Sequence, residues 1–283
     1  MPAAFSLVAT TPPAGATLAE AAPVQIDARG IAIDFFLDGR RQRVLAETDL
    51  TVPKGRLVSL IGPSGCGKST LLKVLAGLIE PDEGHVTVEG LAPREAAKRR
   101  VIGLVFQDAT LLPWKNAIDN AAFLVTAADD MVAKDDALSR AAAMLKLVGL
   151  EGAERKMPSQ LSGGMRQRVA IARALTLDPQ VLLMDEPFGA LDAITREEMA
   201  ECLLDVWERT GKTIVLVTHS IDEAAFLSNE VHVMGGSPAH IIETLPISLA
   251  QPRNEDTLAD PAFKAVQQHL RALLIQSHRR GPA

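Results

Sequence analysis

The fold of this chain is decided by the stretch Gly62-Pro63-Ser64-Gly65-Cys66-Gly67-Lys68-Ser69-Thr70. Its three glycines allow the backbone to curl so that successive N–H groups point inward at phosphate oxygens. From Ser69 onward the sequence predicts a helix, whose N-terminus carries a partial positive charge toward the same point. The apolar run at residues 56–61, ahead of the glycines, is typical of a buried strand. Strand, loop and helix in this order predict an α/β fold that binds a nucleoside triphosphate.

Two side chains of this loop have predictable tasks. Lys68 is expected to reach the β- and γ-phosphates, and the hydroxyl of Ser69 is expected to bind Mg²⁺. The whole stretch from Gly62 to Thr70 is therefore predicted to contact ATP. Cys66 lies inside it, and we interpret it as a packing residue rather than a nucleophile. The alternative is a chance match to a Gly-rich turn, with odds on the order of one in a hundred in a chain of this size.

A pair of carboxylates follows a second apolar run. Residues 181–184 are predicted to form a buried strand that ends at Asp185 and Glu186, and ligands bind at the carboxyl ends of such strands. Asp185 is expected to hold Mg²⁺ through water. Glu186 is expected to point elsewhere, because side chains alternate along a strand, and to take a proton from the attacking water. The alternative is an acidic pair that caps the next helix.

Two further strands are predicted to end in polar side chains. His219 follows the run at residues 213–218, where an imidazole places a donor and an acceptor beside the phosphates. Gln107 follows the run at residues 101–106, and its amide can contact the metal and the water at once. We therefore assign catalytic roles to Glu186, His219, Gln107 and Lys68, and metal-binding roles to Ser69, Gln107 and Asp185.

The class of protein is narrowed by Leu161-Ser162-Gly163-Gly164-Met165-Arg166-Gln167, downstream of the phosphate loop. With the motifs above, in this order, the chain resembles the ATP-binding cassette (ABC) ATPases over about residues 24–235. The resemblance implies that two such domains sandwich two ATP molecules. Ser162 and Gly164 of one chain would then contact the γ-phosphate bound to the other. The segment also opens a predicted helix, and the alternative interpretation of Ser162 is an ordinary N-cap.

The resemblance and the pattern of the sequence together predict the organisation of the chain. The fold class is α/β, a P-loop NTPase core of the ABC ATPase type with an antiparallel β subdomain and an inserted α-helical subdomain. We expect a flexible leader at residues 1–22, the ATPase domain at 23–245 with its helical subdomain at about 110–176, and a helical C-terminal extension at 246–283. Asp38-Gly39 is expected to form a hairpin tip, with the nearby arginines in a solvated turn.

A finer resemblance lies in residues 106–116 and 184–196, which look like the ATPases of nitrate, sulfonate, taurine and bicarbonate importers. Phe35 stands where a Tyr or another aromatic residue of this family stacks on adenine. Phe36 is also aromatic, so the sequence leaves open which of the two phenylalanines contacts the base.

The segment after Gln107 joins the predicted nucleotide site to the helical subdomain. In related importers such a loop lines a groove that receives a short cytoplasmic helix of the permease. We expect Leu111, Leu112 and Trp114 to take part in this docking, because a helix in a groove is held by a few buried anchors. The alternative is that these three are ordinary core residues.

Composition excludes several classes of function. The formal charge of −6 argues against a nucleic-acid partner held by a basic surface. The two cysteines do not provide a disulfide framework. No apolar run approaches the ~20 residues needed to span a bilayer, so attachment to a membrane would have to come through partners.

The sequence thus predicts the ATP-hydrolysing subunit of an importer at the cytoplasmic face of the cell membrane. Its expected partners are a second copy of the chain, a separate transmembrane permease and, indirectly, a solute-binding protein. The expected cargo is a small anionic solute such as nitrate, a sulfonate or taurine. The alternatives are an ABC ATPase in translation or DNA maintenance, and a nucleotide-binding scaffold without turnover. The single cassette and the presence of Glu186 and His219 disfavour these alternatives.

Overall fold

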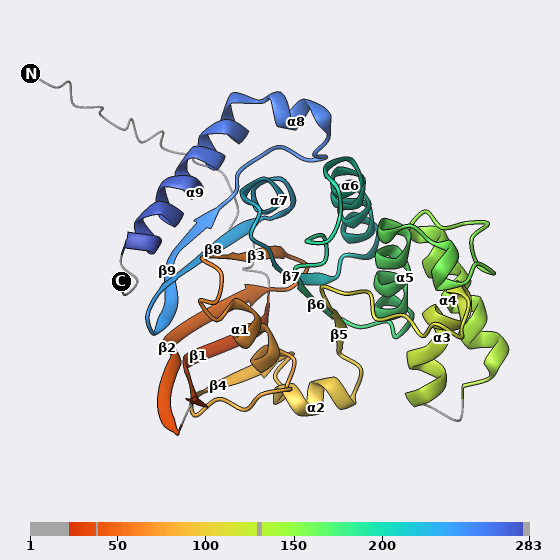
Figure 1. Ribbon diagram of the computed structural model, residues 1–283, viewed down its shortest axis with the longest axis horizontal. Helices are drawn as coiled ribbons and strands as arrows, with labels where there is room; N and C mark the ends of the chain where they lie inside the picture. The colour runs from red at the N-terminus through yellow and green to blue at the C-terminus, as the bar shows by residue number, and fades with distance from the viewer. Residues whose placement is uncertain (1–22, 38, 129–131, 280–283) are drawn as a thin grey trace, which may run out of the picture.

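The computed structural model describes residues 23–37, 39–128 and 132–279, and its strands join in one nine-stranded sheet (Figure 1). The order across the sheet is β4-β1-β2-β9-β8-β3-β7-β6-β5. The strands are β1 Val24–Leu37, β2 Arg40–Pro53, β3 Leu57–Ile61, β4 Glu83–Val88, β5 Ile102–Val105, β6 Val181–Asp185, β7 Thr213–Val217, β8 Glu230–Gly236 and β9 Ala239–Pro246.

The helices cover the sheet and form a separate group at one end of it (Figure 1). They are α1 Lys68–Leu75, α2 Pro93–Lys98, α3 Ala117–Ala128, α4 Lys134–Leu147, α5 Gly163–Thr176, α6 Ala193–Thr210, α7 Ile221–Leu227, α8 Glu255–Ala259 and α9 Pro261–Arg279, with a 3-10 turn, η1, at Pro158–Gln160. Helices α3, α4 and α5 pack on one another beyond β5 and β6, whereas α1 packs against β4, β6 and β7. The predicted α/β core, antiparallel part and helical group are all present.

The antiparallel part of the sheet is built on the long hairpin of β1 and β2. The two strands pair through Phe36 and Arg41 near the tip, which confirms the predicted hairpin, although position 38 lies outside the described residues. The prediction that the arginines form only a solvated turn is wrong for Arg41, which pairs with Asp34, and for Arg43, which pairs with both Asp34 and Glu83. The hydrogen bond from Arg43 is the main reason that the pKa of Asp34 lies below its ordinary value. Opposite charges thus tie this hairpin to β4.

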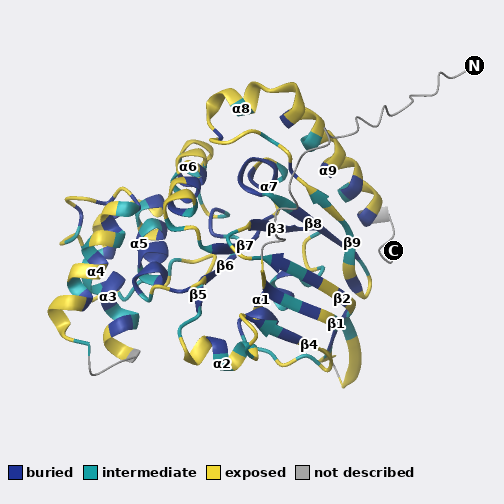
Figure 2. Ribbon diagram, turned by 180° about the vertical axis from the view of Figure 1, so that it is seen from behind, coloured by how far each residue is buried: buried dark blue, intermediate teal, exposed yellow. Residues whose placement is uncertain are grey.

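The parallel part of the sheet holds the strands that precede the predicted site residues. Strand β3 lies between β7 and β8, and β7 is followed by β6 and β5, all in parallel. Every residue of β3 and β7 is buried, which explains why their sequences are continuous apolar runs rather than alternating ones. Figure 2 shows these strands buried, with exposed residues on the outer helices. The carboxyl ends of four strands therefore lie along one edge.

The C-terminal segment packs back onto α7. Helix α9 lies against α7 and β8, and the ring of Phe263 meets that of Phe226 edge to face, with centroids 6.5 Å apart. Arg253 is buried and donates hydrogen bonds of 2.8 Å to the carbonyl oxygens of Phe226 and Ser228. These carbonyls end α7, where a cation satisfies the exposed acceptors and the negative end of the helix dipole. Burial lowers the pKa of Arg253 to about 10, but leaves it charged at neutral pH.

The described part of the chain contains no helix that is both long and apolar enough to cross a bilayer.

We expect Arg253→Ala to lower the free energy of unfolding by about 1–3 kcal/mol, because it leaves two buried carbonyl oxygens without a donor. The measurement is urea denaturation of the purified chain. Arg271→Ala, which removes an exposed arginine of α9, is the matched control and should change stability by less than about 0.5 kcal/mol. Equal effects of the two substitutions would show that Arg253 does not hold the end of α7.

A candidate site for nucleotide binding and hydrolysis

The phosphate loop joins β3 to α1 and has the backbone that its glycines predict. Gly67 has a φ of 99° and is the N-cap of α1. A Cβ atom on Gly67 would come within 2.8 Å of Leu45 Cδ2, and one on Gly62 within 2.6 Å of the carbonyl oxygen of Met234. Glycine is therefore required at these positions by backbone conformation and by close packing. Ser64 and Gly65 are exposed at the tip, while Cys66 is partly buried and packs with the core around α1.

Lys68, the first residue of α1, folds back onto the start of the phosphate loop. Its side chain is buried, and its Nζ donates hydrogen bonds of 2.9 Å to the carbonyl oxygen of Gly62 and 3.0 Å to that of Pro63. Carbonyl oxygens carry no net charge, so the positive charge of the ammonium remains available to an anion. Together with the N-terminus of α1, this charge makes the loop a fitting site for phosphate groups.

Ser69 and Asp185 meet at the place predicted for a metal. The hydroxyl of Ser69 donates a 2.8 Å hydrogen bond to Oδ1 of Asp185, although the two residues lie 116 positions apart in the chain. Within the described ranges, no three His, Cys, Asp or Glu side chains form a group able to hold a metal ion. Hard oxygen donors in such a small number fit Mg²⁺ carried by phosphates, since this ion is held by one or two carboxylates plus phosphate oxygens.

Glu186 faces a different partner from Asp185, as expected, but it lies just beyond β6, so a left-handed backbone and not the alternation along a strand sets its direction. Its Oε2 lies 3.3 Å from Nδ1 of His219, at the end of the neighbouring strand β7. The backbone of Glu186 is left-handed, with a φ of 46°, and its N–H donates to the carbonyl oxygen of Val217. A non-glycine residue in this region costs on the order of 1–3 kcal/mol and persists only where its surroundings fix it. The strand pairing therefore orients this carboxylate toward His219.

Gln107 lies near Glu186 as well, although it follows β5, which is separated from β7 by β6. Gly189 begins the turn at residues 189–192, and a Cβ atom on it would be 3.3 Å from Gln107 Nε2 and 3.7 Å from Glu186 Oε2. The structure thus brings Gln107, Glu186 and His219 together at the end of the parallel strands, beside Ser69 and Asp185. Phe35 and Phe36, on β1, are 36% and 76% exposed, and both remain available to a ligand.

Ser162 and Gly164 are placed in another part of the chain, at the start of α5. Ser162 is exposed, and its Oγ accepts a 3.2 Å hydrogen bond from the N–H of Met165, so it is an N-cap. A Cβ atom on Gly164 would lie 2.4 Å from Cγ2 of Thr195. Within one chain this glycine therefore serves a close approach to α6. Helix α5 stands with α3 and α4, apart from α1 and the phosphate loop (Figure 1).

Sequence reasoning missed the side chains that hold the segment after Gln107. Gln167, which is buried, donates to the carbonyl oxygen of Phe106 at 3.1 Å, and Arg173 donates to the carbonyl oxygens of Ala109 and Thr110 at 2.8 and 3.0 Å. Both donors lie on α5. Gln167 is the last residue of the motif that begins at Leu161, so the sequence did single it out. The motif does not reveal, however, that Gln167 contacts a residue 61 positions away.

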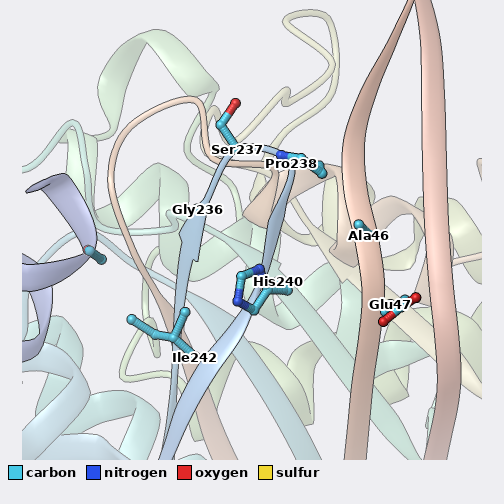
Figure 3. Close-up of a pocket in the computed structure, with 8 residues that line it drawn as sticks. Ala46, Glu47, Gly236, Ser237, Pro238, His240 and Ile242 are labelled. Carbon is cyan, nitrogen blue, oxygen red and sulfur yellow. The ribbon is translucent and has the colours of Figure 1, made fainter. Parts of the chain in front are cut away.

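A cleft of about 490 Å³ lies away from all these residues, between β2, the hairpin of β8 and β9, and the end of α9 (Figure 3). It is lined by Ala46, Glu47, Gly236, Ser237, Pro238, His240, Ile242 and Ser277. None of the predicted site residues lines it, so it is separate from the site at the strand ends.

We expect Gly164→Ala to destabilise the chain by about 1–3 kcal/mol, because the added methyl overlaps with Thr195. Thr195→Ser removes Cγ2 and keeps the hydroxyl that bonds to Asp192, so the double variant should regain most of this stability in urea denaturation. A double variant that is as unstable as Gly164→Ala would show that the contact with Thr195 is not why glycine is needed. If the double variant is stable but fails to hydrolyse ATP, the glycine also serves a contact outside the chain.

Comparison with known proteins agrees with the geometry. Residues 45–189 match the model of the ABC transporter family. The taurine import ATP-binding protein TauB of Pseudomonas aeruginosa is 43% identical over 251 residues, which are 87% of this chain and 94% of that protein. The aliphatic sulfonates import ATP-binding protein SsuB of Bacillus subtilis is 42% identical, over 83% of this chain and 89% of its own.

Solved structures give the same result. The dimeric, post-hydrolysis structure of the ATP-binding cassette MJ0796 bound to ADP and Pi aligns with a TM-score of 0.70 at 31% identity, over 80% of this chain and all of that one. Structure cbiO1 of Clostridium perfringens, part of the ABC transporter complex cbiONQ, aligns with a TM-score of 0.71 at 25% identity, over 89% and 98%. With the family model matching half of the chain and relatives aligning over most of it, this chain belongs to the ABC transporter family.

Proposed function

We propose that this chain is the ATP-hydrolysing subunit of an importer that takes up a small anionic solute through a separate permease. The observation that carries the proposal is the meeting of the Glu186–His219 pair with the Ser69–Asp185 pair at the end of the parallel strands. A scaffold that only binds nucleotide needs no carboxylate held against an imidazole. The taurine and sulfonate relatives are import proteins by name, which favours the importer over a role in translation or DNA maintenance.

The nucleotide would be held by the loop from Gly62 to Thr70. Lys68 and the N-terminus of α1 supply positive charge to the phosphates, and Phe35 or Phe36 supplies an aromatic face to adenine. Ser69, Asp185 and Gln107 would hold Mg²⁺, which neutralises charge on the β- and γ-phosphates when bound. We place this unit at residues 23–245, with its helical part at about 110–176 and an extension at 246–283.

Hydrolysis requires a water aligned with the γ-phosphorus and a group that accepts its proton. In our proposal Glu186 accepts that proton as the water oxygen bonds to phosphorus and the bond to the bridging oxygen of ADP breaks. His219 contacts the same carboxylate and fixes its orientation. Gln107, beside Gly189, orients the water by its amide. Lys68 remains on the phosphate oxygens and balances the charge that develops on them.

Two chains are needed to complete each site. The start of α5 is exposed at Ser162 and stands apart from the phosphate loop of its own chain, so its positive end is free to face a phosphate held by a second copy. We therefore propose a homodimer in which Ser162 and Gly164 of one subunit close on the γ-phosphate of the other. The dimeric structures of MJ0796 are of the same fold and support this arrangement.

The partners follow from the same assignment. The chain would lie at the cytoplasmic face of a membrane, attached through its permease, while a solute-binding protein delivers the cargo on the far side. Trp114 is the candidate anchor for the permease, because its side chain is 71% exposed and it stands on a segment fastened to α5. Leu111 and Leu112 are partly buried, Leu111 against the core, so we assign the docking role mainly to Trp114.

Glu186→Gln tests the proposed chemistry. The amide cannot accept a proton, so steady-state ATP hydrolysis should fall by about 10²–10⁴-fold while ATP binding persists. Because ATP then stays in the site, the variant should form a stable dimer with ATP, measured by size-exclusion chromatography. Hydrolysis at the wild-type rate would remove Glu186 from its assigned role.

Trp114→Ala tests the docking surface. We expect it to weaken copurification with the permease by removing an anchor that contributes about 2 kcal/mol or more, and to leave ATP binding and stability of the isolated chain unchanged. Leu78→Ala, at a residue that is 60% exposed beyond α1, is the control and should copurify normally. Loss of folding or of ATP binding in the isolated Trp114→Ala chain would place Trp114 in the core and contradict the docking role.

A further inference from the structure

A buried carboxylate outside the proposed chemistry lies next to His219. Glu223 is in the first turn of α7, which begins two residues after His219, and only 8% of the residue is exposed. Its Oε2 accepts a hydrogen bond from the hydroxyl of Thr218. The same hydroxyl accepts a 3.0 Å bond from the N–H of Ser220, and Ser220 Oγ accepts a 3.2 Å bond from the N–H of Glu223. The residues on both sides of His219 are thus tied to Glu223, Thr218 to its carboxylate and Ser220 to its backbone N–H.

The other oxygen of Glu223 faces a different element. Oε1 lies 3.6 Å from Nε of Arg196, in the first turn of α6. Arg196 also donates a 2.7 Å hydrogen bond from Nη2 to the carbonyl oxygen of Leu191, in the turn at residues 189–192. This turn begins with Gly189, the residue beside Gln107 and Glu186. One arginine therefore connects Glu223 to the backbone that borders the catalytic side chains.

We propose that Glu223 and Arg196 are positioning residues for ATP hydrolysis. Together they fix the position of His219 relative to the turn at residues 189–192. The inference rests on the proposed function, in which His219 orients the carboxylate of Glu186. Apart from the pair, His219 contacts Glu186, and the 189–192 turn is held by backbone hydrogen bonds from Gly189 and Leu191 and by the N-cap of α6 at Asp192. None of these contacts joins the His219 segment to the start of α6. The pair adds a link between two segments that each touch the reacting groups.

The burial of Glu223 argues against a role in stability alone. The charged groups that face it are Arg196, His219 and Asp222, and burial is the main cause that raises the pKa of Glu223. A raised pKa in the folded state means that the ionised carboxylate is costlier there than in the unfolded chain. This cost is absent below the ordinary pKa of glutamate and is complete above the raised one. An amide of the same shape at this position should therefore fold at least as well at neutral pH.

The experiment compares Glu223→Gln with the wild type in steady-state ATP hydrolysis, with the full chain. We expect kcat to fall by about 3- to 30-fold, the range found when a residue acts through its neighbours. KM for ATP should change by less than about twofold, and the Tm at pH 7.5 should be no lower than that of the wild type, because phosphate binding and packing do not depend on the charge. A structural role predicts the opposite, a lower Tm with unchanged kcat.

Arg196→Gln tests the same link from its more exposed side, and serves if Glu223→Gln does not fold. It should lower kcat to a similar extent, and the double variant should lose no more than either single one, because the two act as a unit. Arg209→Gln, on the same helix and paired with Asp205 on the surface, should keep wild-type kcat. Wild-type kcat in Glu223→Gln, or losses that multiply in the double variant, would overturn the inference and leave the proposed function standing. If the wild type itself fails to hydrolyse ATP, the proposed function fails first.

Discussion

Parallel pairing of β3, β7, β6 and β5 is the constraint on which the site depends. Each of these strands is followed by one part of the chemistry: the phosphate loop, His219, Asp185 with Glu186, and Gln107. Parallel strands all point the same way, so their ends share one edge of the sheet. The apolar runs that bury the strands thus also determine which polar residues meet. A shift in the register of β6 against β7 would separate Glu186 from His219 and misplace the buried side chains of both strands.

Local patterns in the sequence were sufficient to find this edge. Gly67 shows why. Its left-handed backbone and its close contact with Leu45 leave room for glycine alone, and this requirement appears in the sequence as the regular spacing of the glycines. Four strand ends were located from apolar runs followed by a polar residue. The long hairpin, the helical group and α9 were predicted in the same way, from alternation, turn residues and helical period.

The side-chain contacts that connect these parts could not be predicted from local sequence patterns. Gln167, Arg173, Arg196 and Glu223 act across distances in the chain of 27 to 64 residues, and nothing local marks their partners. The arginines of the hairpin show the same limit, since Arg43 was interpreted from its neighbours in sequence while its partner Glu83 lies 40 residues away. The roles of Ser162, Gly164 and the two phenylalanines depend on a second chain or on a nucleotide, so they remain proposals.

The hydrogen bonds that hold the segment after Gln107 are made mainly to its main chain. Gln167 and Arg173 bond to the carbonyl oxygens of Phe106, Ala109 and Thr110, and Asn120 bonds to the N–H and carbonyl oxygen of Leu112. Carbonyl and amide groups are the same whatever side chain is attached to them. The shape of the segment is therefore set largely by α3 and α5, while an exposed side chain such as that of Trp114 takes no part in fixing it. A substitution at this position would therefore alter the outer surface of the segment and leave the geometry of its backbone, and of Gln107 before it, as it is.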